Sequence, residues 1–219
     1  MRTTVVYYTG NGDYPRLEQA VRETIARNCQ GLPIVSVSHQ PLDFGTNICV
    51  GPIEQSPEHV YMQLRLGALA ARTRFVAVCE ADTLYPPEFF RFSPRRTNTY
   101  YYPNTGYITW NNADVFNGKV MHELTGIVGR EHLLRIVSAL QDKWAAIQKL
   151  QTAGHDGRID IPRIVSRAGP AVHADLGPVV TLKTDLGMHW VSPKIRRQRL
   201  LEIPPWGSIQ DVWNTYRCE

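Results

Sequence analysis

The strongest constraint on the fold is a run of five apolar residues, FVAVC at 75–79, followed at once by Glu80-Ala81-Asp82. A short apolar run of this kind is typical of a strand buried on both faces, as in the middle of a parallel sheet. The acidic pair then lies just past the carboxyl end of a central strand, where open α/β sheets bind ligands. Two carboxylates one residue apart can point toward one divalent cation, so Glu80 and Asp82 predict a metal site. The alternative is that they only end the strand.

Composition limits the class of protein without deciding the function. The chain has 219 residues, of which 43% are hydrophobic and 20% charged, so we expect a single globular domain covering residues 1–219. A formal net charge of +4 allows an anionic substrate or nucleic acid but requires neither. The four cysteines form no C-x-x-C pair, which favours reduced thiols in a cytoplasmic protein over a zinc site. With no apolar run approaching 18 residues, we expect no membrane span.

Strand and helix patterns alternate through the first ninety residues. Leu17, Val21 and Ile25 recur every four positions, which indicates an amphipathic helix, and Ser56 followed by Pro57 is a strong start for a second helix. Strand, helix, strand is a right-handed parallel crossover unit, so the sequence predicts an α/β fold with a mostly parallel central sheet flanked by helices. The predicted strands are residues 3–8, 32–38, 47–50 and 75–79, and the predicted helices are residues 14–28 and 57–72.

The second half of the chain is richer in loops and aromatic residues. Two short aromatic segments, residues 98–102 and 107–110, flank a Pro-Asn-Thr-Gly turn and predict a hairpin. A helical period of apolar residues predicts a long helix over 130–150, and residues 179–182 could be a strand. A basic cluster follows near the end of the chain: Lys194, Arg196, Arg197 and Arg199.

The chain contains the segments RLGALAA at 65–71, TGIVGRE at 125–131 and DLGMHW at 185–190. Together these segments resemble the nucleotide-sugar glycosyltransferases of the GT-A fold, especially the family 2-like group. The segment RLGALAA at 65–71, followed by residues 75–82, matches the passage from helix to acidic strand end in that group. Residues 125–131, TGIVGRE, resemble the start of the helix beneath the acceptor site, and residues 185–190 resemble the late segment that supplies a metal-binding histidine. The chain departs from the family in having Glu-x-Asp for Asp-x-Asp, and it lacks a clear Glu-Asp pair for the catalytic base.

The resemblance implies a GT-A (Rossmann-like) fold with a nucleotide-binding half, residues 1–87, and an acceptor half, residues 88–219. It implies transfer of a sugar from a nucleoside diphosphate sugar to an acceptor hydroxyl, dependent on Mn²⁺ or Mg²⁺. The implied metal ligands are Asp82 directly, Glu80 through water or by the ribose, and His189. The donor-binding candidates are Tyr8, Thr9, Asn11, Arg65, Glu80, Lys194 and Arg197. The candidates for the catalytic base are Asp156, Glu123 and His155.

Several alternatives stay open at this stage. Tyr8 could be ordinary core, His189 a surface histidine, and the basic cluster a solvated face. Residues 9–17, TGNGDYPRL, weakly resemble the phosphate loop of sugar-phosphate nucleotidyltransferases, which would act on a nucleoside triphosphate. A non-catalytic nucleic-acid-binding protein is the other alternative, given the aromatic and basic residues near the end of the chain. The small size also fits phage-encoded members that modify DNA bases, which would place the protein in the host cytoplasm. The arginine and lysine cluster near the end favours an anionic acceptor, so we expect a polyanion, with hydroxymethylated DNA as the leading candidate.

Overall fold

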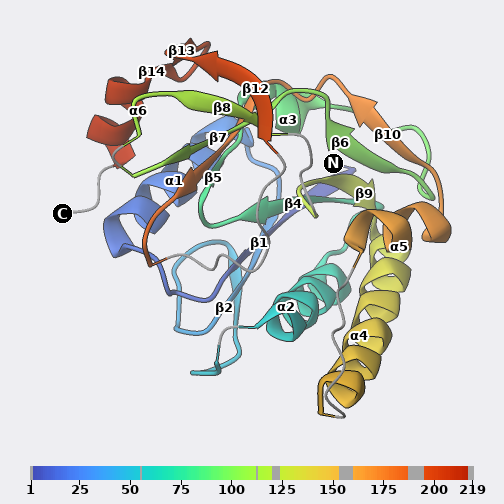
Figure 1. The fold of residues 1–219 in the computed structure, drawn as a ribbon. Helices are drawn as coiled ribbons and strands as arrows, with labels where there is room; N and C mark the ends of the chain where they lie inside the picture. The colour runs from blue at the N-terminus through green and yellow to red at the C-terminus, as the bar shows by residue number, and fades with distance from the viewer. Residues whose placement is uncertain are drawn as a thin grey trace.

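The chain folds around a seven-stranded sheet and a five-stranded sheet, with helices packed against them (Figure 1). The structure is a computed structural model. It describes six stretches of the chain, residues 2–54, 56–111, 113–119, 124–152, 160–186 and 195–216. Within these stretches, no helix combines the length and the apolar character that a bilayer-crossing helix needs.

The larger sheet confirms the predicted α/β class. Its strand order is β10-β6-β9-β4-β1-β2-β3, and β4, β1, β2 and β3 all run parallel. The exception in the centre is β9, which pairs antiparallel with both β4 and β6. The seven strands are β1 (Thr3–Thr9), β2 (Ile34–Ser38), β3 (Thr46–Cys49), β4 (Phe75–Glu80), β6 (Tyr100–Pro103), β9 (Gly126–Gly129) and β10 (Ala171–Ala174).

Helices cover both faces of this sheet because successive side chains of a buried strand point to opposite faces. In β1, Val5 and Tyr7 join one apolar cluster with α1, whereas Val6 joins another with α2 and α4. Figure 1 shows α2 and α4 side by side beneath the sheet. A Cβ added at Gly67 of α2 would lie 2.4 Å from Cγ1 of Val6, so the small residue is needed where this helix crosses β1. These helices are α1 (Pro15–Asn28), α2 (Pro57–Ala70) and α4 (Arg130–Thr152).

The predicted hairpin of residues 98–102 and 107–110 is wrong, because the two strands belong to different sheets. Tyr100 and Tyr101 of β6 pair with β9 in the larger sheet. The strand β7 instead pairs with β8 and β11 in the smaller sheet. Both segments do form strands, but their partners are set by which neighbours bury their side chains, and Tyr100 is fully buried in the larger sheet. The strands of the smaller sheet are β5 (Thr83–Leu84), β7 (Gly106–Trp110), β8 (Phe116–Lys119), β11 (Val179–Lys183) and β12 (Ile195–Leu200).

The last described stretch, residues 195–216, forms strands and a helix. The hydroxyls of Tyr216 and Thr24 are 3.0 Å apart, which ties the last helix to α1. Strands from both sides of residue 87 also complete the larger sheet, so the two predicted halves share one sheet. The remaining elements are α3 (Pro87–Arg91), α5 (Ile161–Ala168), β13 (Glu202–Ile203), β14 (Gly207–Ser208) and α6 (Ile209–Tyr216).

Candidate functional site

The candidate site lies where β1 and β4 end at the same edge of the larger sheet. Tyr8 is in register with Glu80, so the loop after β1 and the turn after β4 begin side by side. This placement confirms that the acidic pair follows a central strand, because β4 lies between β1 and β9 in the sheet. Ligands bind at such an edge in open α/β sheets.

Two predicted donor-binding residues, Thr9 and Asn11, shape the loop after β1. The Thr9 hydroxyl donates to Oε2 of Glu18 at 2.9 Å and accepts from the Asn11 amide at 2.8 Å. Asn11 has a φ of 50°, a left-handed conformation that asparagine tolerates better than most residues. Its side-chain oxygen accepts hydrogen bonds from the amides of His39 at 3.0 Å and Gln40 at 2.9 Å. The loop is therefore tied to the end of β2.

The segment after β11 closes over this loop from the other half of the chain. The Thr184 hydroxyl donates to Oδ1 of Asp13 at 2.7 Å, and the Tyr14 hydroxyl donates to Oδ1 of Asp185 at 2.9 Å. Burial raises the pKa of Asp13, although hydrogen bonds from the Thr184 hydroxyl and the Tyr14 amide oppose this, and burial likewise raises the pKa of Glu18. The contact between Asp13 and Thr184, which are 171 positions apart, has no signal in the sequence.

Asp82 is held by an ion pair that the sequence did not predict. Oδ2 of Asp82 lies 2.6 Å from Nζ of Lys183, and Oδ1 accepts from the Thr83 hydroxyl at 3.0 Å. Both side chains of the pair are largely buried, with 16% of Asp82 and 18% of Lys183 exposed. Burial opposes ionisation, but Lys183 and the buried Lys119 outweigh it and lower the pKa of Asp82. Asp82 is therefore a carboxylate that faces ammonium groups.

Glu80 makes its contacts in a different direction. Its Oε1 accepts from the Thr125 hydroxyl at 2.8 Å, just before β9, and its amide donates to the Tyr85 hydroxyl at 2.7 Å. The side chain of Asp82 instead bonds Lys183 at the end of β11. The two carboxylates thus fasten different elements to the end of β4.

The predicted metal site is only partly within the described residues, because His189 lies outside them. Both carboxylate oxygens of Asp82 have protein partners, Oδ2 with the ammonium of Lys183 and Oδ1 with the Thr83 hydroxyl. Among the residues that the structure describes, no three His, Cys, Asp or Glu side chains gather where they could hold a metal ion. The requirement for Mn²⁺ or Mg²⁺ stays a prediction.

Only some of the other predicted site residues lie within the described part of the structure. Tyr8 is half-buried and packs against the apolar cluster that includes α2, while Arg65 lies exposed on α2. Arg197 belongs to β12, and the position of its side chain is outside what the structure describes. Five further candidates lie outside the described residues, so their roles stay predictions: Glu123, His155, Asp156, His189 and Lys194.

His39, which borders the loop after β1, gives a prediction about acid stability. It is only 6% exposed, and burial, with His59 nearby, lowers its pKa. In the unfolded chain the His39 ring binds a proton below about pH 6.5, whereas in the folded chain it binds that proton only at lower pH. The free energy of unfolding should therefore fall as the pH decreases below about 6.5. Urea unfolding between pH 7.5 and 5.5 should show a smaller loss for His39→Gln than for the wild type. An NMR titration midpoint of His39 at or above 6.5 would contradict this.

Comparison with known proteins gives similarities of fold alone. No family model and no curated protein matches the chain. The solved structures similar to it include S. aureus TarS 1-349 in complex with UDP-GlcNAc, with 11% identity, a TM-score of 0.49, and coverage of 86% of this chain and 60% of that one. A glycosyltransferase involved in glycosylation of the major capsid of PBCV-1 has 11% identity, a TM-score of 0.44, and coverage of 80% and 82%. Bifunctional IspDF from Campylobacter jejuni has 9% identity, a TM-score of 0.44, and coverage of 80% and 50%.

The chain spans about 60% of TarS 1-349. At these identities and TM-scores the likenesses concern fold and not chemistry, which must come from the residues of this chain. The solved structures similar to the chain include glycosyltransferases.

Proposed function

We propose that the chain transfers a sugar from a nucleoside diphosphate sugar to an acceptor hydroxyl at the edge formed by the ends of β1, β4 and β11. The observation that carries the proposal is the convergence of the loop after β1, Asp82 and Lys183 at the carboxyl end of parallel strands. Such an edge suits a nucleotide, and the two halves of the chain meet there.

The departing diphosphate needs positive charge, because negative charge develops on it as the glycosidic bond breaks. Lys183 and Lys119 are described cations close enough to Asp82 to lower its pKa. In our proposal these ammonium groups face the diphosphate, with Asp82 holding Lys183 in place. The charged groups at this edge also include Asp13 and Asp185, which would repel a diphosphate placed directly against them.

The donor's nucleoside and the acceptor complete the proposal. Tyr8 and Thr9 would flank the base, and Glu80, already oriented by Thr125, would accept a hydrogen bond from the ribose. The base that takes the acceptor proton would be Glu123 or Asp156, as the sequence predicts. For the acceptor we keep hydroxymethylated DNA as the leading candidate.

A thermal-shift screen with nucleoside diphosphates tests the proposal. A ligand at about 100 times its dissociation constant should stabilise the chain by roughly 2.7 kcal/mol. The screen should be run with Mn²⁺ and with a chelator. A shift in melting temperature that disappears with the chelator supports binding through the predicted metal. A shift that persists supports binding of the diphosphate by Lys183 and Lys119 without a metal. Absence of any shift with every nucleotide contradicts the proposal.

Two further measurements make the test specific. Lys183→Gln should lose most of the shift, whereas Lys143→Gln, on an exposed position of α4, should keep it. Release of nucleoside diphosphate from a nucleotide sugar supports transfer. Release of pyrophosphate from a nucleoside triphosphate and a sugar phosphate would instead show a nucleotidyltransferase.

A further inference from the structure

Six arginines line two adjoining hollows at the amino end of β4, the opposite end of that strand from Glu80. One hollow has a volume of about 390 Å³ and the other of about 600 Å³, and Arg74 borders both. We call this surface the arginine face. Its arginines in the described part of the chain are Arg2, Arg72, Arg74, Arg95, Arg130 and Arg135.

The arginine face concentrates positive charge. Glu131 is the one carboxylate in the described lining of the two hollows, which leaves a surplus of five positive charges. The formal net charge of the entire chain is only +4. The basic character of this protein therefore resides largely on one face, and such a field attracts anionic partners.

Two arginines near the middle of the face are held in position by the fold. The guanidinium of Arg130 donates to the carbonyl oxygen of Ala71 at 2.9 Å and to Oε1 of Glu131 at 2.6 Å. Its amide donates to the carbonyl oxygen of Arg74 at 3.0 Å, which joins the start of α4 to the start of β4. The Arg74 guanidinium carbon lies 5.8 Å from the centre of the Phe75 ring, within range of a cation–π contact.

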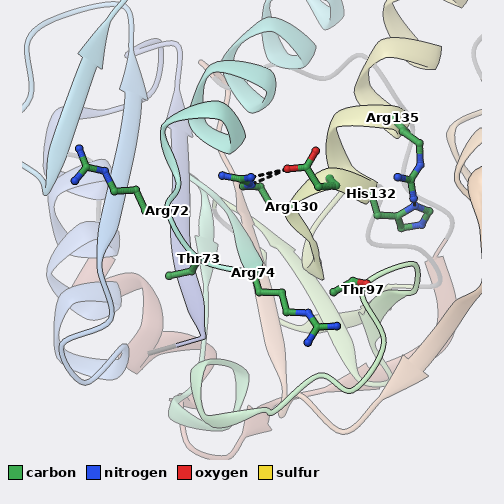
Figure 2. A pocket seen from close by; sticks show the side chains of 8 residues that line it. Arg72, Thr73, Arg74, Thr97, Arg130, His132 and Arg135 are labelled. Carbon is green, nitrogen blue, oxygen red and sulfur yellow. Dashed lines mark hydrogen bonds and ion pairs between the residues drawn. The ribbon is translucent and has the colours of Figure 1, made fainter.

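Arg135 is oriented by a buried histidine. His132 is fully buried, and burial together with Arg135 lowers its pKa. Its Nδ1 accepts the hydrogen bond from Nη2 of Arg135 at 3.2 Å, because a guanidinium can only donate. Figure 2 shows Arg135 and His132 on one side of the first hollow, Arg74 and Arg130 near its middle, and Arg72 extending away on the other side. The cations are spread along the surface and do not converge on one point.

We infer that the arginine face binds the phosphate backbone of a nucleic acid. Guanidinium groups match phosphate oxygens in paired hydrogen bonds, and a spread of six suits successive phosphates better than one anion. The aromatic rings in the described lining, Phe75 and His132, are 2% and 0% exposed and cannot stack on a base. Binding through phosphates alone carries no sequence information, so we expect little sequence preference.

An anionic membrane suits the arginine face less well. Proteins that lie on membrane surfaces combine basic residues with exposed apolar ones. The large exposed apolar side chains of the described residues are absent from the lining of both hollows: Leu69, Val172, Leu186 and Leu201. The inference does not depend on sugar transfer. A nucleic acid bound at the arginine face would leave the opposite edge of the sheet, where β1 and β4 end, accessible to a nucleotide.

The test is binding of a labelled 20-base-pair duplex of mixed sequence, measured by fluorescence anisotropy over a range of salt concentrations. Each phosphate contact contributes about −0.9 to the slope of log K against log salt. The variant Arg72→Gln/Arg74→Gln/Arg135→Gln should bind at least about tenfold more weakly at 0.1 M salt, and its slope should be shallower by about three. Arg130 is left unchanged because it bonds Ala71.

The matched control is Arg27→Gln/Arg163→Gln/Arg167→Gln, which removes the same charge from exposed positions on α1 and α5. It should retain most of the affinity and slope. Equal losses in both variants, or no loss in the first, would overturn the inference. So would competition by inorganic phosphate as effective as competition by unlabelled duplex at equal phosphate concentration, which would indicate a single-anion site. Binding to vesicles containing phosphatidylserine without binding to the duplex would overturn it as well.

Discussion

Asp82→Asn is expected to reduce the turnover of sugar transfer by at least about a hundredfold, the typical effect of losing one charged group that positions a catalytic interaction. The amide can still accept a hydrogen bond from Lys183, but it no longer balances the charge of an ammonium that is 18% exposed. We expect a loss of stability of about 1–3 kcal/mol as well. Turnover and urea unfolding should be measured on the same preparation, so that lost folding is not mistaken for lost chemistry.

Two comparisons make the Asp82 prediction specific. Glu80→Gln should be milder, since the amide oxygen of glutamine can accept the Thr125 hydrogen bond that Glu80 accepts. Asp114→Asn is the surface control, because Asp114 pairs with Arg199 at 3.6 Å while both side chains are mostly exposed, and such pairs contribute little. A folded Asp82→Asn protein with wild-type turnover would contradict the assigned role of Asp82, as would equal losses in Asp82→Asn and Asp114→Asn.

Gly129→Ala is expected to destabilise the chain by about 3 kcal/mol, at the upper end for overpacking in a core. A Cβ at this position would lie 2.0 Å from the carbonyl oxygen of Thr97 and 2.8 Å from its Cα. Both are backbone atoms, so no side-chain rotation relieves the contact. The strand β9 lies between β4 and β6, and any shift of it disturbs both neighbours. Urea unfolding of the variant measures the cost.

Gly67→Ala is the matched comparison for Gly129→Ala. The added Cβ would again be too close, at 2.4 Å, but the atom it meets is Cγ1 of the Val6 side chain. Alanine also favours a helix over glycine by up to about 1 kcal/mol. The cost at Gly67 should therefore be the smaller of the two. Equal stability of Gly129→Ala and the wild type would show that the Thr97 backbone can move freely, contrary to this prediction.

The sequence alone determined the elements whose signals are local. The apolar run at 75–79 predicted β4 as a buried central strand, and β4 lies fourth in the seven-stranded sheet. Ser56 and Pro57 predicted the start of α2, where the Ser56 hydroxyl accepts from the His59 amide at 3.3 Å. The period of apolar residues predicted α4, which runs from Arg130 to Thr152. Each of these signals is a local propensity or a periodicity over a short stretch of sequence. It can be recognised without knowing which distant residues pack against that stretch.

Tertiary structure alone decided which distant segments meet. The partner of Asp82 is a lysine 101 positions later, and nothing near Lys183 marks it. The aromatic segments 98–102 and 107–110 have the pattern of a hairpin, yet they joined different sheets. The arginine face gathers Arg2, Arg74 and Arg130 from three separate parts of the chain. Strand pairing and ion pairing depend on which surfaces the whole chain buries together, and a local pattern does not contain that information.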